Sequence, residues 1–360
     1  QAAEMTPDGF TFYGGVSHGV EKRSKVRSRI VADQLVKLIK EADHVVIMGH
    51  RMSDLDAIGS AEGVLRICKI CDVPAVIAVR RDATLAGSLI DALCKAGQRD
   101  DFIDPKDALP IISKRTLCIV VDTYQAGLVE SKEILEKCGR VAVIDHHRKG
   151  VGYIQNPDLV CHEPYSSSAS ELVTELLQYV GDRDDKPNRV EAEGLLSGIM
   201  LDTRDFTLHT GVRTFEAAAA LRRYGAETER VRQLFDVTMV EYNAKAGLVE
   251  KAKMYRNCAI SIGGEVAAEA RVAIAQAAND LLTIQGVDAS FVAVQVGTGV
   301  NVSARSLGAV NVQVIMESLG GGGHQTMAAA QLKHITPEAA RSRIEGAIDK
   351  YYASQKKGRC

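Results

Sequence analysis

Aspartate and histidine residues recur in this sequence at the points where apolar runs end. Short runs at 45–48, 117–121 and 141–144 are apolar throughout, and a longer apolar stretch lies at 195–201. The polar residues that follow them are His50, Asp54, Asp56, Asp122, Asp145, His146, His147 and Asp202. A single aspartate after a strand is most often a helix N-cap, and Asp56 could cap the helix after it. Capping leaves the three histidines unexplained.

The same side chains suit a metal centre. Carboxylates gathered without a cation would raise one another's pKa and destabilise the fold. Carboxylate oxygens and imidazole nitrogens, with no thiolate among them, are ligands for ions such as Mn²⁺ or Mg²⁺. The set is larger than one ion needs. It therefore indicates two ions about 3.5–4 Å apart, an arrangement used for in-line attack on phosphorus.

The elements that must position these residues can be read from the apolar pattern. Continuous apolar runs are typical of strands buried on both faces of a parallel sheet. Helical periodicity separates the runs, at 24–43, 56–69 and 128–137. Another helix is predicted from Ser168, which has capping-box spacing to Glu171. The alternation predicts an α/β fold with a doubly wound, mainly parallel sheet, whose ligands bind beyond the carboxyl ends of the strands.

The second half of the sequence predicts a smaller α/β domain. Residues 226–256 are charged and helical without a strand signal, and we interpret them as a connector. Strand-like stretches lie at 258–262, 271–274, 291–296 and 300–304, with a helix near 310–319. The predicted organisation is an irregular segment at 1–23, a first domain at 24–225, the connector at 226–256 and a second domain at 257–350.

Composition argues against several classes of protein. The 360 residues hold 44 Lys and Arg against 46 Asp and Glu, which is a poor composition for binding duplex nucleic acid. No apolar run approaches the roughly 18–20 residues that cross a bilayer. The eight cysteines form no disulfide-scaffold pattern, which favours a reducing cytosol. The motifs Gly15-x-Ser17-x-Gly19 and Cys68-x-x-Cys71 lack the context of a nucleophile elbow or a zinc site.

Four motifs in a fixed order carry a family resemblance. They are His50-x₃-Asp54-x-Asp56, then Asp122, then Asp145-His146-His147, then Asp202. This order resembles the signature of the DHH phosphoesterase superfamily. The segment 301–306 and the run Gly320–Gly323 with His324 resemble the accessory DHHA1 domain, and together the two domains cover about residues 40–350. Within the superfamily, 303–312 and the glycine run are most similar to the GdpP-type cyclic-di-AMP phosphodiesterases.

The resemblance implies a role for each residue of the cluster. It implies two Mn²⁺ ions, one held by His50 and Asp54 and the other by Asp56, His146 and Asp202, with Asp122 bridging them. Asp145 would orient a ligand, and His147 would contact the scissile phosphate. The ions would lower the pKa of a shared water, and the resulting metal-bound hydroxide would attack phosphorus. The implied reaction converts cyclic di-AMP to 5′-pApA in a homodimeric enzyme.

The second domain is implied to bind the substrate. Its glycines would let backbone N–H groups approach a phosphate, and its arginine would offer a planar bidentate donor. The residues carried over are Ser303, Arg305, Gly321, Gly322, Gly323 and His324. Two alternatives stay open: a nanoRNase or pAp phosphatase that acts on short oligoribonucleotides, and a non-catalytic nucleotide sensor.

Several features of the sequence lie outside this pattern. The superfamily usually has Pro at Ser53, and commonly His-Arg/Lys-Pro-Ser where this chain reads 124–127. Neither change removes a ligand, but the second leaves that loop without its basic side chain. Residues 1–23 resemble the tail of a degenerate GGDEF domain, which would make this chain the cytoplasmic part of a membrane-anchored bacterial protein. We expect structural roles for His18, His44, His162, His209 and His334.

Overall fold

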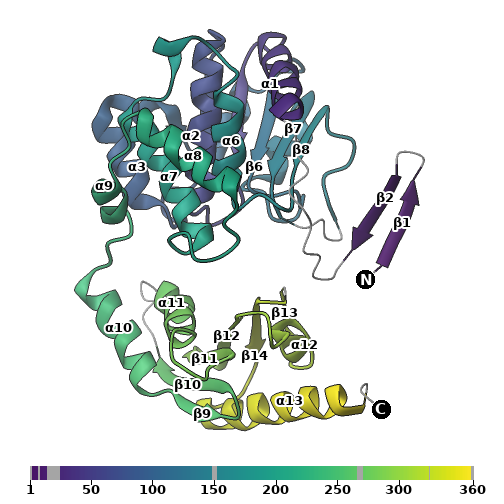
Figure 1. Cartoon of the computed structure of the whole chain (residues 1–360), viewed down its shortest axis with the longest axis vertical. Coiled ribbons are helices and arrows are strands. Elements are labelled where there is room, and N and C mark those ends of the chain that lie inside the picture. Colours follow the sequence, from purple (N-terminus) through teal and green to yellow (C-terminus); the bar gives the residue numbers. More distant parts are fainter. Residues whose placement is uncertain are drawn as a thin grey trace. The chain divides into compact units, whose positions relative to one another are not determined.

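The computed structural model describes residues 2–6, 9–13, 25–147, 152–265, 271–323 and 325–357. The chain divides into two compact units, Gln1–Asp236 and Val237–Cys360 (Figure 1). The predicted connector at 226–256 is therefore shared between them. Helix α9 (Thr228–Gln233) belongs to the first unit, whereas α10 (Met239–Glu250) and strand β9 (Lys253–Tyr255) belong to the second.

The N-terminal segment contains regular structure. Strands β1 (Ala2–Thr6) and β2 (Gly9–Tyr13) pair antiparallel, so the prediction of an irregular segment is wrong for these residues. The second strand reads Phe-Thr-Phe-Tyr after its glycine, and aromatic and β-branched residues favour strands. The Gly15-x-Ser17-x-Gly19 motif lies outside the described residues.

The first unit is built on a six-stranded, all-parallel sheet, as predicted. Its strand order is β5-β4-β3-β6-β7-β8. The strands are β3 (Val45–Met48), β4 (Ala75–Ala78), β5 (Phe102–Ile103), β6 (Leu117–Val121), β7 (Arg140–Asp145) and β8 (Leu159–His162). The chain builds outward from β3 in one direction and then from β6 in the other. The point between β3 and β6 is thus the topological switch point, where ligands bind in such sheets.

Both faces of this sheet are buried, which explains the continuous apolar runs. Val45 and Ile47 of β3 pack into one core, and Val46 and Met48 pack into another on the opposite face. The first core is covered by α1 (Lys25–Lys40), α2 (Leu55–Ile70), α3 (Gly87–Leu93), α6 (Ala169–Leu177), α7 (Arg189–Thr203) and α8 (Val212–Arg223) (Figure 1). The second core is covered by α4 (Pro105–Ala108) and α5 (Lys132–Lys137).

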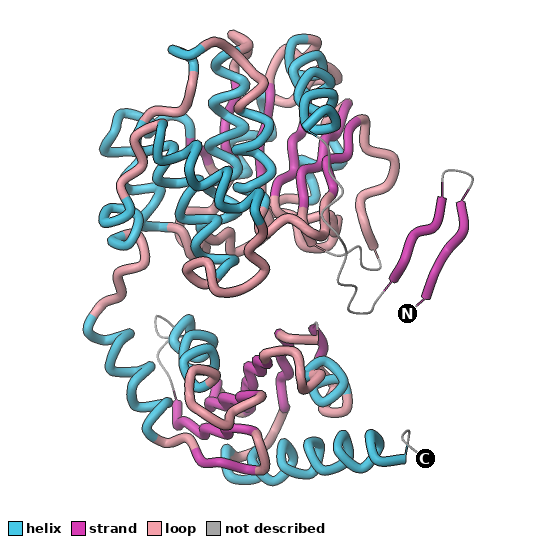
Figure 2. Tube along the Cα trace, viewed as in Figure 1, coloured by secondary structure: helices cyan, strands magenta, loops and turns pink. Residues whose placement is uncertain are grey.

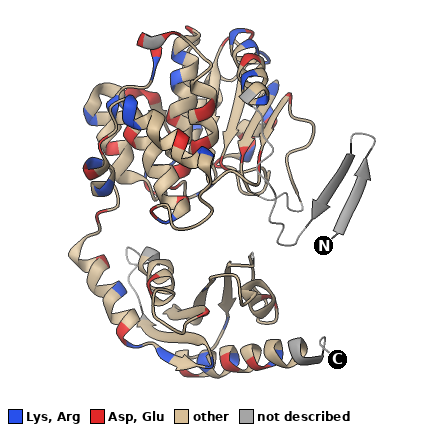
Figure 3. Cartoon of the chain, in the orientation of Figure 1, with Lys and Arg blue, Asp and Glu red and all other residues tan. Residues whose placement is uncertain are grey.

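The second unit has a mixed sheet. Its order is β13-β14-β12-β11-β10-β9, in which only β10 and β11 are parallel. The further strands are β10 (Cys258–Glu265), β11 (Ala289–Val296), β12 (Gly299–Ser306), β13 (Gly322–Gly323) and β14 (Met327–Leu332). Helix α12 (Val312–Glu317) confirms the helix predicted near 310–319, and α13 (Pro337–Lys357) is the long C-terminal helix in Figure 2. Acidic and basic residues are interspersed along α13 (Figure 3).

One strand predicted in this unit is a helix. Residues 271–274 begin α11 (Arg271–Leu281). Ala273, Ala277 and Leu281 are fully buried at intervals of four residues, so the apolar pattern has a helical period that the short run concealed. Among the described residues, no helix has both the length and the apolarity to span a bilayer.

Candidate functional site

The loop after β3 presents His50 and Asp54. The Nδ1 atom of His50 lies 2.8 Å from the carbonyl oxygen of Arg51, to which it donates, so Nε2 carries a free lone pair in the neutral ring. That Nε2 lies 3.4 Å from Asp122 Oδ2 and 3.8 Å from Asp54 Oδ1. Asp54 caps helix α2, because its Oδ1 accepts hydrogen bonds from the N–H groups of Asp56 and Ala57. The cap of this helix is therefore Asp54 and not Asp56.

Asp56 is held by a different helix. Its side chain is fully buried in the first turn of α2. Oδ2 accepts the N–H of Ala169 at 2.7 Å, and Oδ1 accepts the N–H of Ser170 at 2.8 Å. These are the first two residues of α6, whose N-terminal N–H groups favour a carboxylate. Helix α6 is capped by Ser168, as predicted, with Glu171 N–H donating to its hydroxyl.

Asp122 occupies the centre of the cluster. It follows β6 in a left-handed conformation with φ 57°, and its N–H donates to Ile144 O of the neighbouring strand. The turn aims one carboxylate oxygen at each of two histidines. Oδ2 lies 3.4 Å from His50 Nε2, and Oδ1 lies 3.4 Å from His146 Nε2.

The end of β7 and the last turn of α7 complete the cluster. His146 Nε2 lies 3.0 Å from Asp202 Oδ2 and 3.9 Å from Asp56 Oδ2. The buried carboxylate of Asp145 contacts His147, whose ring Nδ1 also lies 3.5 Å from Asp122 Oδ1. Asp145 Oδ1 accepts the His147 N–H at 3.2 Å and the ring Nδ1–H at 2.9 Å. The structure thus brings together all eight residues that the sequence placed at the ends of apolar runs.

The cluster fits divalent cations. Asp122 Oδ1 and His146 Nε2 are buried and make no hydrogen bond within the described structure. Donor atoms gather in three groups that share Asp122, with the atoms of each group within 4.8 Å of one another. The groups are His50, Asp54 and Asp122, then Asp56, Asp122, His146 and Asp202, and then Asp122, His146 and His147. Buried nitrogen and oxygen atoms that face one another without hydrogen bonding are suited to surround a cation.

The electrostatics of the cluster support this reading. Burial raises the pKa of Asp56 well above its ordinary value, and the charges of Asp122 and Asp202 add to the effect. Burial opposes the charged form of His50, but the nearby carboxylates of Asp122 and Asp54 outweigh it and raise the pKa of His50 to about 11. The pKa of His146 is likewise raised, because Asp122 and Asp202 outweigh burial. Without metal, the cluster would retain protons that a divalent cation can replace.

Sequence reasoning missed one contact in this region. His162, at the end of β8, lies with its Nε2 2.5 Å from the carbonyl oxygen of His147. The contact joins a side chain to a backbone atom 15 residues away, so no motif marks it. His44, His209 and His334 belong to no metal-binding group of the described residues. Cys68 is buried in α2, and burial raises the pKa of its thiol, which disfavours a reactive thiolate.

The predicted substrate residues lie in the second unit. Arg305 is largely buried on β12 and donates to Ser303 Oγ at 3.1 Å and to Ala304 O at 2.9 Å. Gly322 and Gly323 form β13, which pairs with β14, the neighbour of β12. Gly323 has φ 147°, in the region that favours glycine. His324 lies outside the described residues.

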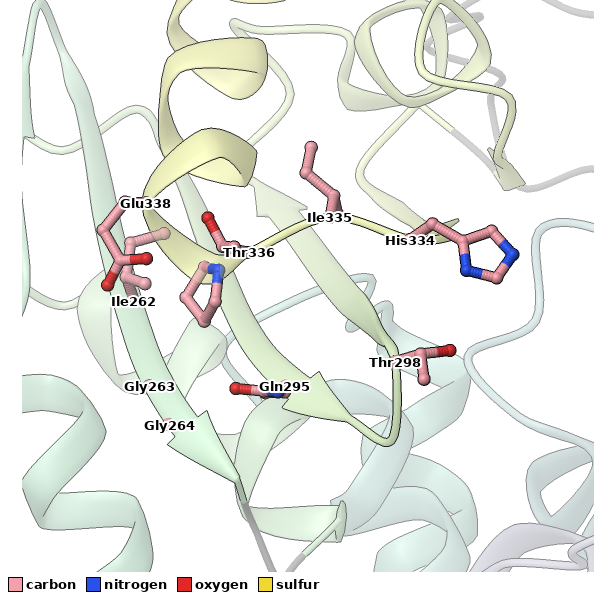
Figure 4. A pocket seen from close by; sticks show the side chains of 10 residues that line it. Ile262, Gly263, Gly264, Gln295, Thr298, His334, Ile335, Thr336 and Glu338 are labelled. Carbon is pink, nitrogen blue, oxygen red and sulfur yellow. The ribbon is translucent and has the colours of Figure 1, made fainter.

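A separate cavity of about 600 Å³ lies at the other end of β11 and β12 (Figure 4). Gln295, Thr298, His334 and the first residues of α13 line it, together with Ile262, Gly263 and Gly264 of β10. None of the predicted substrate residues contributes to it.

Comparisons with known proteins agree with this geometry. Residues 44–199 match the DHH family, N-terminal domain, and residues 265–352 match the DHHA1 domain. The chain is 46% identical over 352 residues to the cyclic-di-AMP phosphodiesterase GdpP of Geobacillus thermodenitrificans, covering 96% of this chain and 53% of that protein. It is 42% identical over 362 residues to the cyclic-di-AMP phosphodiesterase GdpP of Bacillus subtilis, covering 98% of this chain and 54% of that protein.

A solved structure shares the fold. An exopolyphosphatase-related protein from Bacteroides fragilis superimposes with a TM-score of 0.77 at 21% identity, over 91% of this chain and 98% of that one. The chain spans about half the length of the curated relatives it matches. The resemblance that the four motifs predicted is confirmed: the chain carries a DHH domain followed by a DHHA1 domain.

Proposed function

We propose that this chain hydrolyses cyclic di-AMP to linear 5′-pApA. The observation that carries the proposal is that two metal-binding groups, one with His50 and Asp54 and one with Asp56 and Asp202, share Asp122 at the switch point of the parallel sheet. Two adjacent cations suit hydrolysis of a phosphodiester, since both the attacking and the leaving oxygen need charge stabilisation. The names of the relatives support cyclic di-AMP as the substrate.

The residues divide into two metal-binding sets. His50 and Asp54 would hold one ion, Asp56, His146 and Asp202 would hold the other, and Asp122 belongs to both sets. We propose Mn²⁺ as the ion, because the set mixes carboxylates with imidazoles. When bound, such cations lower the pKa of a water molecule and offset the charge on the phosphoryl oxygens.

His147 is the residue proposed to contact the scissile phosphate. Its ring is about half exposed, at 47%, and its Nδ1–H is occupied by Asp145. Burial opposes the imidazolium, but the hydrogen bond to Asp145 and the charge of Asp122 raise the pKa of His147. The imidazolium donates from Nε2, the nitrogen that remains available. His147 can therefore hold a proton at Nε2 for an oxygen of the phosphate.

The second unit is proposed to bind the nucleotide. The guanidinium of Arg305 is anchored by Ser303 and the Ala304 carbonyl, which fixes its orientation toward a phosphate. The absence of side chains at Gly321, Gly322 and Gly323 would let a second phosphate approach the backbone, although the N–H of Gly321 itself donates to Met316 O at 2.9 Å. We also propose His324, the next residue in the sequence, as a donor to the substrate.

Product analysis tests the proposal. The purified protein is incubated with cyclic di-AMP and Mn²⁺, and the nucleotides are separated by chromatography. We expect metal-dependent conversion to pApA and none with Asp122→Asn, since Asn accepts the left-handed backbone at 122 but removes the charge. A wild type that leaves cyclic di-AMP intact, or an Asp122→Asn variant as active as wild type, would refute it. Parallel reactions with pApA and pAp measure preference for the alternative substrates.

A further inference from the structure

We propose that His162 is a positioning residue, which fixes the backbone of His147 and thereby the direction of its imidazole. This inference rests on the proposed function, because it concerns the residue that is to contact the phosphate. His162 belongs to none of the metal-binding groups among the described residues.

His147 lies beside two carboxylates, and one of them accepts its hydrogen bonds. The N–H and the ring Nδ1–H of His147 both donate to the same oxygen of Asp145, whereas Asp122 Oδ1 is 3.5 Å from Nδ1. These two hydrogen bonds restrain the N–H and the ring of His147 but not its carbonyl group. Since the ring is half exposed, packing alone restrains it weakly.

His162 supplies the missing restraint. Its Nε2 lies 2.5 Å from the carbonyl oxygen of His147. A carbonyl only accepts, so Nε2 of His162 carries a proton and donates it. The neutral Nε2–H tautomer and the imidazolium both make this bond, so the restraint persists whichever of these two forms is present.

The position of His162 is itself fixed by two elements. In the sheet, His162 of β8 is paired with Asp145 of β7, and Glu163 N–H donates to Asp145 O at 3.0 Å. The strand pairing therefore holds the backbone of His162 opposite Asp145, the residue whose carboxylate accepts both hydrogen bonds from His147. One strand pairing thus aligns both restraints on His147.

The ring of Tyr124 packs against the imidazole of His162. The two ring centroids are 5.7 Å apart with an interplanar angle of 37°. Tyr124 is buried and lies two residues after Asp122, and its carbonyl accepts Ile154 N–H at 2.9 Å. The loop that follows Asp122 thus contributes Tyr124, whose ring lies against the imidazole of His162. This loop is also where the sequence departs from the usual pattern of the superfamily.

Three substitutions at one position separate a positioning role from a packing role. His162→Gln keeps a donor near the position of Nε2, His162→Asn places its amide about one bond too short, and His162→Phe keeps the ring on Tyr124 but has no donor. We expect the Phe and Asn variants to lose about five- to tenfold in kcat on cyclic di-AMP, the effect of one hydrogen bond. We expect unchanged KM and Mn²⁺ affinity in all three, a Tm lowered by no more than roughly 2–4 °C in the Phe and Asn variants, and near wild-type kcat for the Gln variant.

Each outcome either supports or overturns the positioning role of His162. A Phe or Asn variant with wild-type kcat, or a Gln variant as slow as Phe, overturns the positioning role. If the wild type itself does not hydrolyse cyclic di-AMP, the proposed function fails, and His162 is judged by imidazole ¹⁵N NMR of the manganese-free protein. A change in the His147 ring signals in the Phe variant that the Gln variant reverses supports the role. Identical His147 signals in wild type and Phe variant overturn it.

Discussion

Gly198 of helix α7 faces Asp56 of helix α2 so closely that a methyl group at position 198 would lie 2.6 Å from a carboxylate oxygen of Asp56. The same methyl group would lie 2.3 Å from Ser170 Oγ, at the start of α6. Three helices therefore converge on one buried carboxylate, and glycine is the side chain that leaves room for it. The geometry of the metal-binding cluster depends on this contact between helices.

Replacing Gly198 by Ala should disturb the cluster without removing any ligand. We expect a loss of about 1–3 kcal/mol in the free energy of unfolding, as is typical of overpacking, together with weaker Mn²⁺ binding. Circular dichroism melts and calorimetric metal titrations measure the two effects. Gly346→Ala is the matched control, because Gly346 is exposed in α13 with open space around its Cα, and alanine there should stabilise by up to about 1 kcal/mol. Equal behaviour of the two variants would contradict the interpretation.

Removal of metal should destabilise the protein more at high pH than at low pH. In the metal-free fold the pKa values of Asp56, His50 and His146 are raised, so the folded state holds protons that the unfolded chain has released. Stability of the metal-free protein therefore falls as pH rises toward the folded pKa values. Bound Mn²⁺ replaces these protons, and at about 1,000 times its Kd it stabilises by about 4 kcal/mol. The difference in Tm between Mn²⁺-loaded and EDTA-treated protein should be larger at about pH 8.5 than at about pH 6. A difference in Tm that becomes smaller as pH rises would exclude this linkage between metal binding and protonation.

A second pH effect should come from Glu62, which belongs to none of the metal-binding groups among the described residues. Glu62 is fully buried in α2 and accepts a hydrogen bond from Gln98. Burial and the charge of Glu191 raise its pKa to about 8, from 4.5 for the ordinary carboxyl. Between these values the folded state keeps the proton and the unfolded chain has lost it, so the free energy of unfolding falls as pH rises.

Glu62→Gln should remove this slope. We expect wild type to lose up to about 1.4 kcal/mol per pH unit relative to the variant between about pH 6 and 7.5. Urea denaturation followed by far-UV circular dichroism measures it, since the chain has no tryptophan. Parallel slopes for wild type and variant would show that Glu62 titrates normally.

Arg305→Lys should separate binding from chemistry. Lysine keeps the positive charge but loses the planar pair of donors, so we expect KM for cyclic di-AMP to rise at least about tenfold with little change in kcat. Arg341→Lys is the matched control, because Arg341 of α13 pairs only with Glu345 among the described residues, at 2.8 Å. Steady-state kinetics of both variants give the comparison. A KM for Arg305→Lys equal to that of the control would remove Arg305 from the substrate site.

The chemistry-bearing residues were more predictable than the elements between them. Asp122 and Asp145 follow buried runs, and parallel strands bring such positions to one edge by topology alone. The sequence did not distinguish Asp54 from Asp56 as the helix cap, because both positions precede the helical pattern. The strand predicted at 271–274 was wrong because four apolar residues fit either period. Short strands such as β4 and β8 were missed.

Contacts that depend on tertiary structure were beyond sequence reasoning. The hydrogen bond from His162 to His147 O and the approach of Gly198 to Asp56 join segments whose pairing no local pattern specifies. The roles of the individual ligands, a homodimer, and an upstream membrane region stay predictions.

All eight residues of the cluster lie between positions 50 and 202, within the first unit, whereas Ser303, Arg305 and the glycine run lie in the second. The proposed catalytic cluster and the proposed nucleotide-binding residues thus lie in separate domains, which can be inherited separately. Exchange of the C-terminal domain during evolution would change which phosphodiesters are bound and would leave the metal-binding cluster intact.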